Sequence, residues 1–312
     1  MKKELIGRTS SRQNDLYHIV TNKIIEALEK GTEPWRKTWD TENEGLPVNA
    51  ATGRYYSGIN VMLLWMGAIE KGVNSNRWLT FNQARCAGGS VRRGEKSTLV
   101  TLFKPFTEDS FDSEAEDSSD SEAEDKLTHS SRCFMARFHL FNIEQCENLP
   151  ETFYAKKPVL LDAERIDRAE SVVISSGVPV IHRYQDCAYY HPKNDHIVIP
   201  EMGQFHSVED YYCTLLHELV HSTGHTSRLA RKGIITSLSK KMSNPVYAFE
   251  ELIAEIGSAF LCAELGIQGH LQHENYIASW LKILKEDHKA IFRAARYAKE
   301  AFEYLILNTN KK

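Results

Sequence analysis

The spacing of apolar residues divides the chain into helical and strand-like segments. In residues 14–31 apolar side chains recur every three or four positions, which predicts a helix that begins at Asn14 or Asp15 and ends at Gly31. The stretch YYSGINVMLLWMGAIEKG, residues 55–72, predicts a second helix, and within it VMLLWMGAI, residues 61–69, is the longest nearly apolar run of the chain. This run has about half the length that a membrane-spanning helix needs, so we expect no membrane partner.

Two runs rich in β-branched and aromatic residues, 97–106 and 132–145, predict a pair of strands. Between them lies EDSFDSEAEDSSDSEAED, residues 108–125, with ten acids, no base and the hexapeptide DSEAED twice. Such a segment cannot bury apolar surface and repels itself, so we expect a disordered acidic insertion at 108–131. An alternative is that it mimics DNA or shields a basic face when no ligand is bound.

The pattern changes after a linker near residues 148–158. A helix at 162–177 precedes two strand-like runs, 179–184 and 187–200, and the second is predicted to be a hairpin that turns at residues 193–195. A helix capped by Ser207 follows, and further helices are expected at 244–267 and 274–307. The sequence therefore predicts an α+β protein of two domains, residues 1–150 and 158–312, the second with a small sheet followed by helices.

Composition agrees with a soluble globular protein. Of the 312 residues 42% are hydrophobic and 26% charged, and the basic N-terminus has no apolar core behind it, so a cytoplasmic location is expected. The cysteines form no C-x-x-C pair, which argues against a cysteine zinc site or a disulfide framework. They are Cys86, Cys133, Cys146, Cys187, Cys213 and Cys262.

The stretch LLHELVHSTGH, residues 215–225, contains the pattern H-E-x-x-H. His217 and His221 stand four positions apart on a predicted helix, so both imidazoles can reach one zinc ion. Glu218 turns toward the same cleft, where such a glutamate is the usual general base of metalloproteases. The apolar back of this helix favours metal binding over a merely solvated polar face.

A third protein ligand has several candidates. The longer pattern H-E-x-x-H-x-x-G-x-x-H ends here at Ser227, which cannot serve, and His225 comes too early unless the turn at Gly224 brings it back. The segment EELIAE offers Glu250, Glu251 and Glu255. Glu251-x-x-x-Glu255 resembles the arrangement of thermolysin-like gluzincins, in which the first acid binds zinc and the second hydrogen-bonds a liganding histidine. This resemblance implies Glu251 as the ligand and Glu255 as the orienting acid, with Glu255, Glu250 and His225 as alternative ligands. Two imidazoles and a carboxylate suit Zn²⁺ best, with Mn²⁺, Co²⁺ or Ni²⁺ as alternatives.

Several stretches resemble one family closely. Residues 15–39, 88–104 and 138–150 are similar to the N-terminal domain of ArdC-type antirestriction proteins, and residues 188–229 and 247–267 to their zincin-type C-terminal domain. The resemblance implies an N-terminal α+β domain that binds single-stranded DNA and a C-terminal zincin-like metallopeptidase domain, with a small sheet and the H-E-x-x-H helix. It also implies a mobile-element protein that protects incoming DNA from restriction, with His217 and His221 as metal ligands and Glu218 as the catalytic-type acid.

The N-terminal half has features of a DNA-binding surface. Residues 1–107 hold 16 Lys and Arg against 10 Asp and Glu, although the whole chain carries a net charge of −4. Basic and aromatic residues alternate, as expected where phosphates are neutralised and bases stack. The candidates are Trp35, Arg36, Lys37, Trp39, Arg54, Tyr55, Tyr56, Arg77, Trp78, Phe81, Arg85, Arg92, Arg93 and Lys96. Trp65, inside its apolar run, is assigned to the core.

Three functions remain open at this point. The first is an antirestriction protein that binds single-stranded DNA and carries a zinc metallopeptidase-like site. The second is an active metalloprotease that cleaves DNA-bound host proteins, which would make a host protein a second partner. The third is a DNA-binding module whose metal is purely structural.

Overall fold

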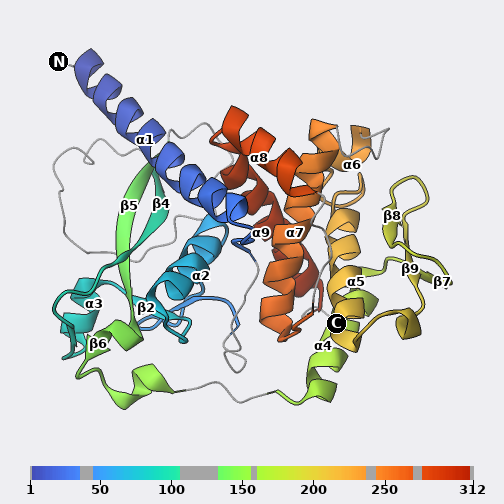
Figure 1. Cartoon of the computed structure of the whole chain (residues 1–312), viewed down its shortest axis with the longest axis horizontal. Coiled ribbons are helices and arrows are strands. Elements are labelled where there is room, and N and C mark those ends of the chain that lie inside the picture. Colours follow the sequence, from blue (N-terminus) through green and yellow to red (C-terminus); the bar gives the residue numbers. More distant parts are fainter. Residues whose placement is uncertain are drawn as a thin grey trace.

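The computed structural model describes residues 2–35, 45–105, 133–155, 160–236, 244–269 and 276–309 (Figure 1). Within these ranges the chain combines long helices with small sheets, which confirms the predicted α+β class. The predicted acidic insertion at 108–131 lies outside the described residues, as do Arg36, Lys37 and Trp39.

The N-terminal half is built around a four-stranded sheet in the order β1-β2-β5-β4. Strands β4 (Thr98–Pro105) and β5 (Cys133–Asn142) pair antiparallel from Thr98↔Leu140 to Pro105↔Cys133, which confirms the predicted strand pair. The short strands β1 (Val48–Asn49) and β2 (Arg77–Leu79) extend the sheet. A second antiparallel pair joins β3 (Ser90–Val91) to β6 (Cys146–Glu147).

Three helices accompany these strands. Helix α1 (Lys2–Glu29) begins a dozen residues earlier than the predicted cap at Asn14 or Asp15, and its apolar positions from Leu16 to Leu28 are largely buried. Helix α2 (Ile59–Lys71) is the predicted apolar run and packs on β4. Helix α3 (Phe81–Cys86) starts with a reciprocal capping box between Thr80 and Gln83. The short 3₁₀ turns η2 (Ile143–Gln145) and η3 (Glu151–Tyr154) lead toward the second half.

The C-terminal half opens with α4 (Asp162–Ser176) and a three-stranded sheet in the order β7-β9-β8. Strand β7 (Val180–Arg183) runs parallel to β9 (His196–Pro200), and β8 (Tyr189–His191) forms the predicted hairpin with β9. The turn η4 (Met202–Gln204) leads into α5 (Val208–Thr223). The Ser207 hydroxyl accepts a hydrogen bond of 3.0 Å from the Asp210 amide, which confirms the predicted cap.

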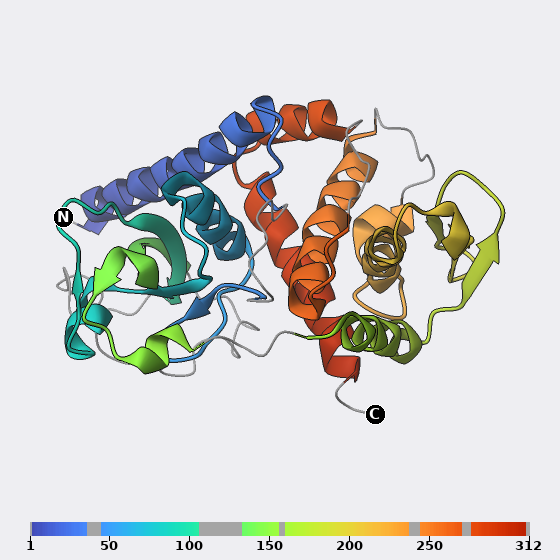
Figure 2. The ribbon, with the colours of Figure 1, turned by 60° about the horizontal axis from the view of Figure 1, so that its bottom comes forward.

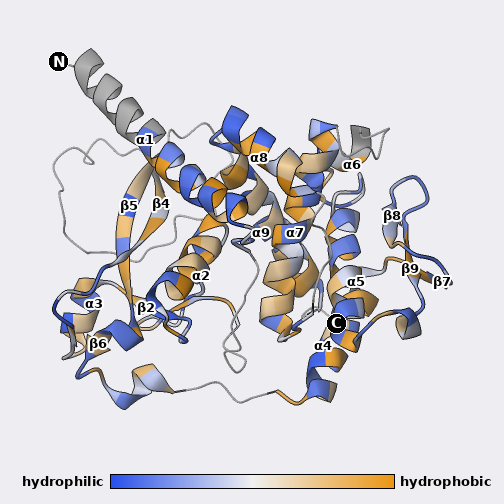
Figure 3. Cartoon of the chain, viewed as in Figure 1, coloured by the Kyte–Doolittle hydropathy of each residue, from blue (hydrophilic) through white to orange (hydrophobic). Residues whose placement is uncertain are grey.

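Helices α5 and α7 (Pro245–Leu265) cross at close range, and this contact determines the geometry of the site. At Gly257 an added Cβ would lie 2.9 Å from the Val220 side chain, so only glycine allows this approach. Helices α6 (Lys232–Thr236), α8 (Ile277–Glu286) and α9 (Ala290–Thr309) surround α7. Figure 3 shows the hydrophobic residues concentrated on the central helices and hydrophilic residues at the β8–β9 turn.

The two halves share one hydrophobic core. Trp35 meets Trp280 edge to face with ring centroids 5.3 Å apart, and Trp65 meets Phe260 at 6.1 Å. The Thr21 hydroxyl donates a 2.6 Å hydrogen bond to the His288 carbonyl, where α1 reaches the α8–α9 region (Figure 2). The domain boundaries 1–150 and 158–312 stay a prediction. The two halves pack against each other through one continuous hydrophobic core.

Candidate metal centre

Helix α5 presents the H-E-x-x-H motif toward α7. His217 and His221 lie one turn apart, with ring centroids 4.8 Å apart and ring planes at 82°. Both side chains and Glu218 are buried, and Leu215, Leu216, Leu219 and Val220 on the same helix have almost no exposed surface. The apolar residues fix the helix in the core. The two histidines face α7, where their polar partner Glu251 lies.

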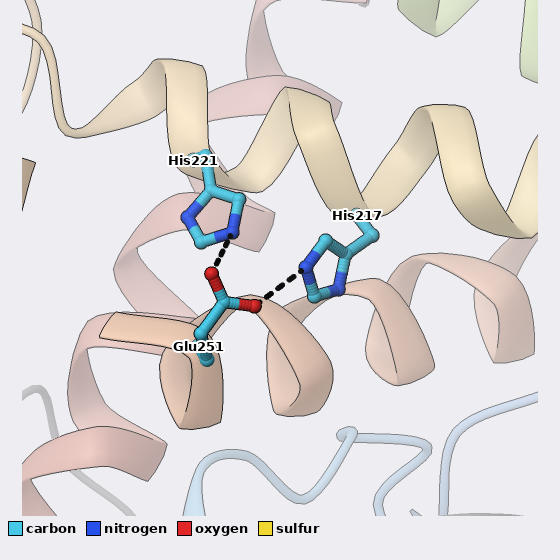
Figure 4. Close-up of side chains that lie close together, drawn as sticks. All are labelled: His217, His221 and Glu251. Atoms are coloured by element: carbon cyan, nitrogen blue, oxygen red, sulfur yellow. Dashed lines mark ion pairs between the residues drawn. The ribbon is translucent and has the colours of Figure 1, made fainter. Parts of the chain in front are cut away.

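The carboxylate of Glu251 completes the cluster from α7 (Figure 4). Its Oε2 lies 3.4 Å from His217 Nε2, and its Oε1 lies 3.4 Å from His221 Nε2. Ligand atoms roughly 2.0–2.2 Å from a tetrahedral zinc are about 3.3–3.6 Å apart, so each of the two nitrogen–oxygen distances is close to that of a zinc site. Among the described residues they form the one group of three or more potential ligands within 4.8 Å of one another.

The charges of the cluster explain its proton equilibrium. Burial alone favours the neutral imidazole of His221, but the nearby carboxylates of Glu251, Glu250 and Glu218 raise its pKa to about 10. Burial acts in the opposite sense on Glu251, and the two imidazoles lower its pKa far below the usual value. The raised pKa keeps His221 protonated at neutral pH, and a metal ion that ligates this ring must displace that proton.

Glu218 is held by the neighbouring hairpin. The Tyr190 backbone N–H, on strand β8, donates a 2.6 Å hydrogen bond to Glu218 Oε2. The Tyr190 hydroxyl donates to Asp195, and Arg228 forms an ion pair with the same carboxylate. The hairpin therefore orients the catalytic-type glutamate beside the two histidines, a link that no spacing in the sequence predicts.

The other candidate ligands occupy different positions. Glu250 Oε1 lies 3.5 Å from His221 Nδ1, on the opposite edge of the ring from Glu251. The His225 Nδ1 atom lies 2.7 Å from the Ser227 hydroxyl and 3.9 Å from Asp195. Glu255 is buried on α7 but is not part of the three-residue cluster. Its role as an orienting acid stays a prediction, and Glu250 is a second acid of α7, besides Glu251, that lies beside His221.

Sequence reasoning missed two residues of the site. Tyr247, one turn before Glu251, lies within hydrogen-bonding reach of Glu251 and Tyr276, and burial together with the Glu251 charge raises its pKa. Arg231 forms a buried ion pair with Glu250 at 2.6 Å. A tyrosine in an apolar helix and an arginine in a loop have no spacing signal, so only the folded chain assigns them to the site.

The predicted DNA-binding residues are distributed between surface and core. Most of the basic candidates are exposed around α3 and the β3 turn, and Arg92 forms a 2.7 Å ion pair with Glu95. The exposed candidates are Arg54, Tyr55, Phe81, Arg85, Arg92, Arg93 and Lys96. Arg77 is partly exposed and its guanidinium donates to the Ala155 carbonyl. These residues provide a basic surface with aromatic rings, and their role in DNA binding stays a prediction.

Two aromatic predictions are corrected by the structure. Trp78 has no exposed surface and Trp35 only 2%, so neither ring is free to stack on a base. Trp35 packs on Trp280, and Trp78 belongs to a small core with Leu64 and Val100. Tyr56 is partly buried against the same core, and its hydroxyl accepts a 3.0 Å hydrogen bond from Asn49. Alternation with basic residues looked like a stacking pattern but reflects strand and turn geometry.

Comparison with known proteins agrees with both halves. Residues 14–141 match the family model of the N-terminal domain of anti-restriction factor ArdC, and residues 167–297 match that of a zincin-like metallopeptidase. The metal-free crystal structure of antirestriction ArdC from plasmid R388 is 36% identical, with a TM-score of 0.75 over 95% of this chain and 98% of that one. The chain belongs to the ArdC family. The Mn(II)-bound structure of the R388 protein matches with a TM-score of 0.73 over 94% of this chain and 98% of that one, again at 36% identity.

Further relatives differ in length. An uncharacterized protein y4eC of Sinorhizobium fredii is 34% identical over 96% of this ArdC-family chain and 94% of its own length. Two DNA primases TraC of Escherichia coli are each 39% identical over 93% and 92% of this chain. The chain spans only 20% and 26% of the length of those two primases. No helix in the described part of the chain is long and apolar enough to cross a membrane.

Proposed function

We propose that this protein is an antirestriction protein of a mobile element, which binds single-stranded DNA through its N-terminal half and holds a divalent metal in its C-terminal half. The observation that carries the proposal is the convergence of His217, His221 and Glu251 within an ArdC-family fold. Cytoplasmic action on incoming DNA, as expected from the sequence, belongs to the same proposal.

His217, His221 and Glu251 would hold the metal, with zinc as the first choice because two imidazoles and one carboxylate suit it. Manganese is supported as an alternative by the Mn(II)-bound R388 ArdC, and cobalt and nickel remain in the same set. When bound, such a cation supplies Lewis-acid polarisation of a carbonyl and lowers the pKa of bound water.

Glu218 would act as the proton acceptor of a hydrolytic reaction. It is 7% exposed, and its Oε2 is fixed by the Tyr190 amide. The other carboxylate oxygen remains to accept a proton from a water or substrate beside the metal. This arrangement supports the second candidate function, a metalloprotease that cleaves a host protein bound to the same DNA.

Single-stranded DNA would lie on the basic surface of the N-terminal half. Arg85, Arg92, Arg93 and Lys96 would neutralise phosphates there, and the exposed Tyr55 and Phe81 rings would stack on bases. Arg36 and Lys37 remain candidates for the same role. Such binding weakens steeply with salt because counterions are released when phosphates are neutralised.

The decisive experiment compares two variants in a host that restricts incoming DNA. Arg92→Ala with Arg93→Ala should weaken binding to single-stranded DNA and reduce protection. The slope of log affinity against log salt should fall by about one for each phosphate that is no longer neutralised. Glu218→Gln should retain metal, measured by elemental analysis, and DNA affinity, but should abolish any peptide cleavage.

The pattern of protection separates the two functions. Protection that survives Glu218→Gln but is lost in the double arginine variant supports shielding of the DNA strand. The reverse pattern supports proteolysis. DNA affinity that does not respond to salt would contradict the proposed DNA surface.

A further inference from the structure

The loop that follows α5 folds back toward this helix and places the guanidinium of Arg231 against Glu250, which is next to Glu251 in the sequence. The Arg231 backbone N–H donates a 3.0 Å hydrogen bond to the Gly224 carbonyl, which closes the loop at the end of the helix. Ala230 adopts a left-handed backbone with φ 49°, an unfavourable conformation for alanine. The strained residue directs the next side chain inward, and Arg231 is only 5% exposed.

Buried partners satisfy the guanidinium on all sides. Its NH2 group donates to Glu250 Oε1 at 2.6 Å and to the Val220 carbonyl at 2.7 Å, and its Nε also contacts the Glu250 carboxylate. Its NH1 group donates to the Thr223 hydroxyl at 2.6 Å. Arg231 therefore joins the last turn of α5 to the acid that precedes Glu251 on α7.

Glu250 in turn faces a metal-ligating ring. Its Oε1 lies 3.5 Å from His221 Nδ1, while the opposite nitrogen, Nε2, faces Glu251. The α6 backbone packs tightly against the Glu250 carboxylate, because a Cβ added at Gly233 would lie 2.8 Å from Glu250 Oε2. The carboxylate is thus confined from one side by Arg231 and from another by the α6 backbone.

We propose that Glu250 and Arg231 are positioning residues of the metal centre. The 3.5 Å separation of Glu250 Oε1 from His221 Nδ1 is an ion-pair distance and not a hydrogen bond in this structure. When a metal is ligated through Nε2, Glu250 would accept the Nδ1–H of His221, and Arg231 holds the carboxylate on that edge of the ring. A histidine that ligates through one nitrogen usually donates its other N–H to such a partner, which sets the tautomer and strengthens the ligand. This inference rests on the proposed metal centre and extends it to two residues outside the motif.

A purely structural role does not account for this arrangement. A buried ion pair contributes little net stability, because an apolar pair of similar volume often does as well. What an apolar pair cannot do is accept a hydrogen bond from the Nδ1–H of His221. The structural role and the positioning role can therefore be distinguished by replacing both Arg231 and Glu250, so that neither is left as an unpaired buried charge.

The experiment uses two double variants of the full chain, with zinc affinity measured by competition against a chelator. Arg231→Met with Glu250→Leu removes the acceptor and should lower zinc affinity about 10- to 100-fold. Arg231→Gln with Glu250→Gln keeps a neutral acceptor and should lose less. In zinc-loaded wild type, ¹⁵N NMR should show a protonated, slowly exchanging Nδ1 at His221, and the apolar pair should lose that protection.

Val172→Ala, a core truncation on α4, controls for instability alone, since Val172 is buried far along the sequence from the site. It should lower Tm and leave zinc affinity unchanged; an affinity loss as large as that of the double variants overturns the inference. Wild-type affinity in both double variants also overturns it. If the variant Arg231→Met with Glu250→Leu does not fold, the zinc affinity of the variant Arg231→Gln with Glu250→Gln is compared with that of Val172→Ala instead. Wild type that takes up no zinc would instead refute the metal centre itself.

Discussion

The ring of His221 is where the site's chemistry is concentrated. Its Nε2 faces Glu251 at 3.4 Å and its Nδ1 faces Glu250 at 3.5 Å, so two adjacent acids of α7 contact opposite edges of one imidazole. Because consecutive residues of a helix point about 100° apart, both can reach the ring only if it lies directly over the helix. This geometry assigns the two acids different roles although they are neighbours in the sequence.

Glu251→Gln tests the ligand assignment. The amide keeps the size of the side chain but is a much poorer ligand for zinc than a carboxylate. Zinc affinity should therefore fall by more than the roughly 10- to 100-fold typical of losing a group that only supports a ligand. Chelator competition on the folded protein measures it. Glu255→Gln, one turn further along the same helix, is the matched control and should cost less. A larger loss from Glu255→Gln would reassign the third ligand.

At the scale of elements, the site depends on how closely α5 and α7 approach. The motif histidines are on one helix and Glu251 on the other, and the close contact of Val220 with Gly257 lies between the two helices. The hairpin adds a third element, since β8 holds Glu218 through the Tyr190 amide. The metal cluster and Glu218 therefore depend on the relative positions of three elements, which are α5, α7 and the β8–β9 hairpin.

Gly257→Ala should disturb the packing of α7 against α5. The added methyl group would overlap Val220, and overpacking of this kind costs about 1–3 kcal/mol, measured by urea unfolding of the metal-free protein. Gly257→Ala combined with Val220→Ala makes room again, so the two changes together should cost less than the sum of each alone. Strict additivity in this double-mutant cycle would mean that the two helices are not in contact at this point.

At the scale of the whole molecule, the N-terminal half and the C-terminal half with the metal cluster are joined by a common core. Helix α1 contacts α8, α2 contacts α9, and Trp35 and Trp65 both meet aromatic rings of the C-terminal half. The hydrophobic core therefore extends across both halves of the chain.

Metal removal should reveal this shared core. We expect one calorimetric transition for the full chain, because a common core unfolds cooperatively. Zinc at about 100 times its Kd should add about 2.7 kcal/mol and raise Tm by several degrees, and excess chelator should reverse the shift. The variant His217→Ala with His221→Ala should show no such shift. Two separate transitions, of which only one responds to zinc, would indicate independently folding domains.

The local patterns that sequence reasoning used proved reliable where one element acts alone. An apolar run identified α2, the Ser207 cap identified the start of α5, and β-branched runs identified the β4–β5 pair. The H-E-x-x-H spacing placed His217 and His221 one turn apart on α5. Alternating basic and aromatic residues were a weaker signal. They led to Trp35 and Trp78, whose burial depends on partners far away in the chain.

The sequence by itself determined the class of the fold and the pair of histidines that can share a metal, because periodicity and motif spacing act over a few residues. Only the tertiary structure decided which of three acids contacts both histidines, which backbone amide holds Glu218, and that Arg231 supports Glu250. Those contacts join residues on different elements, and their distances follow from helix crossing and loop closure. Neither quantity is encoded in any short stretch of residues.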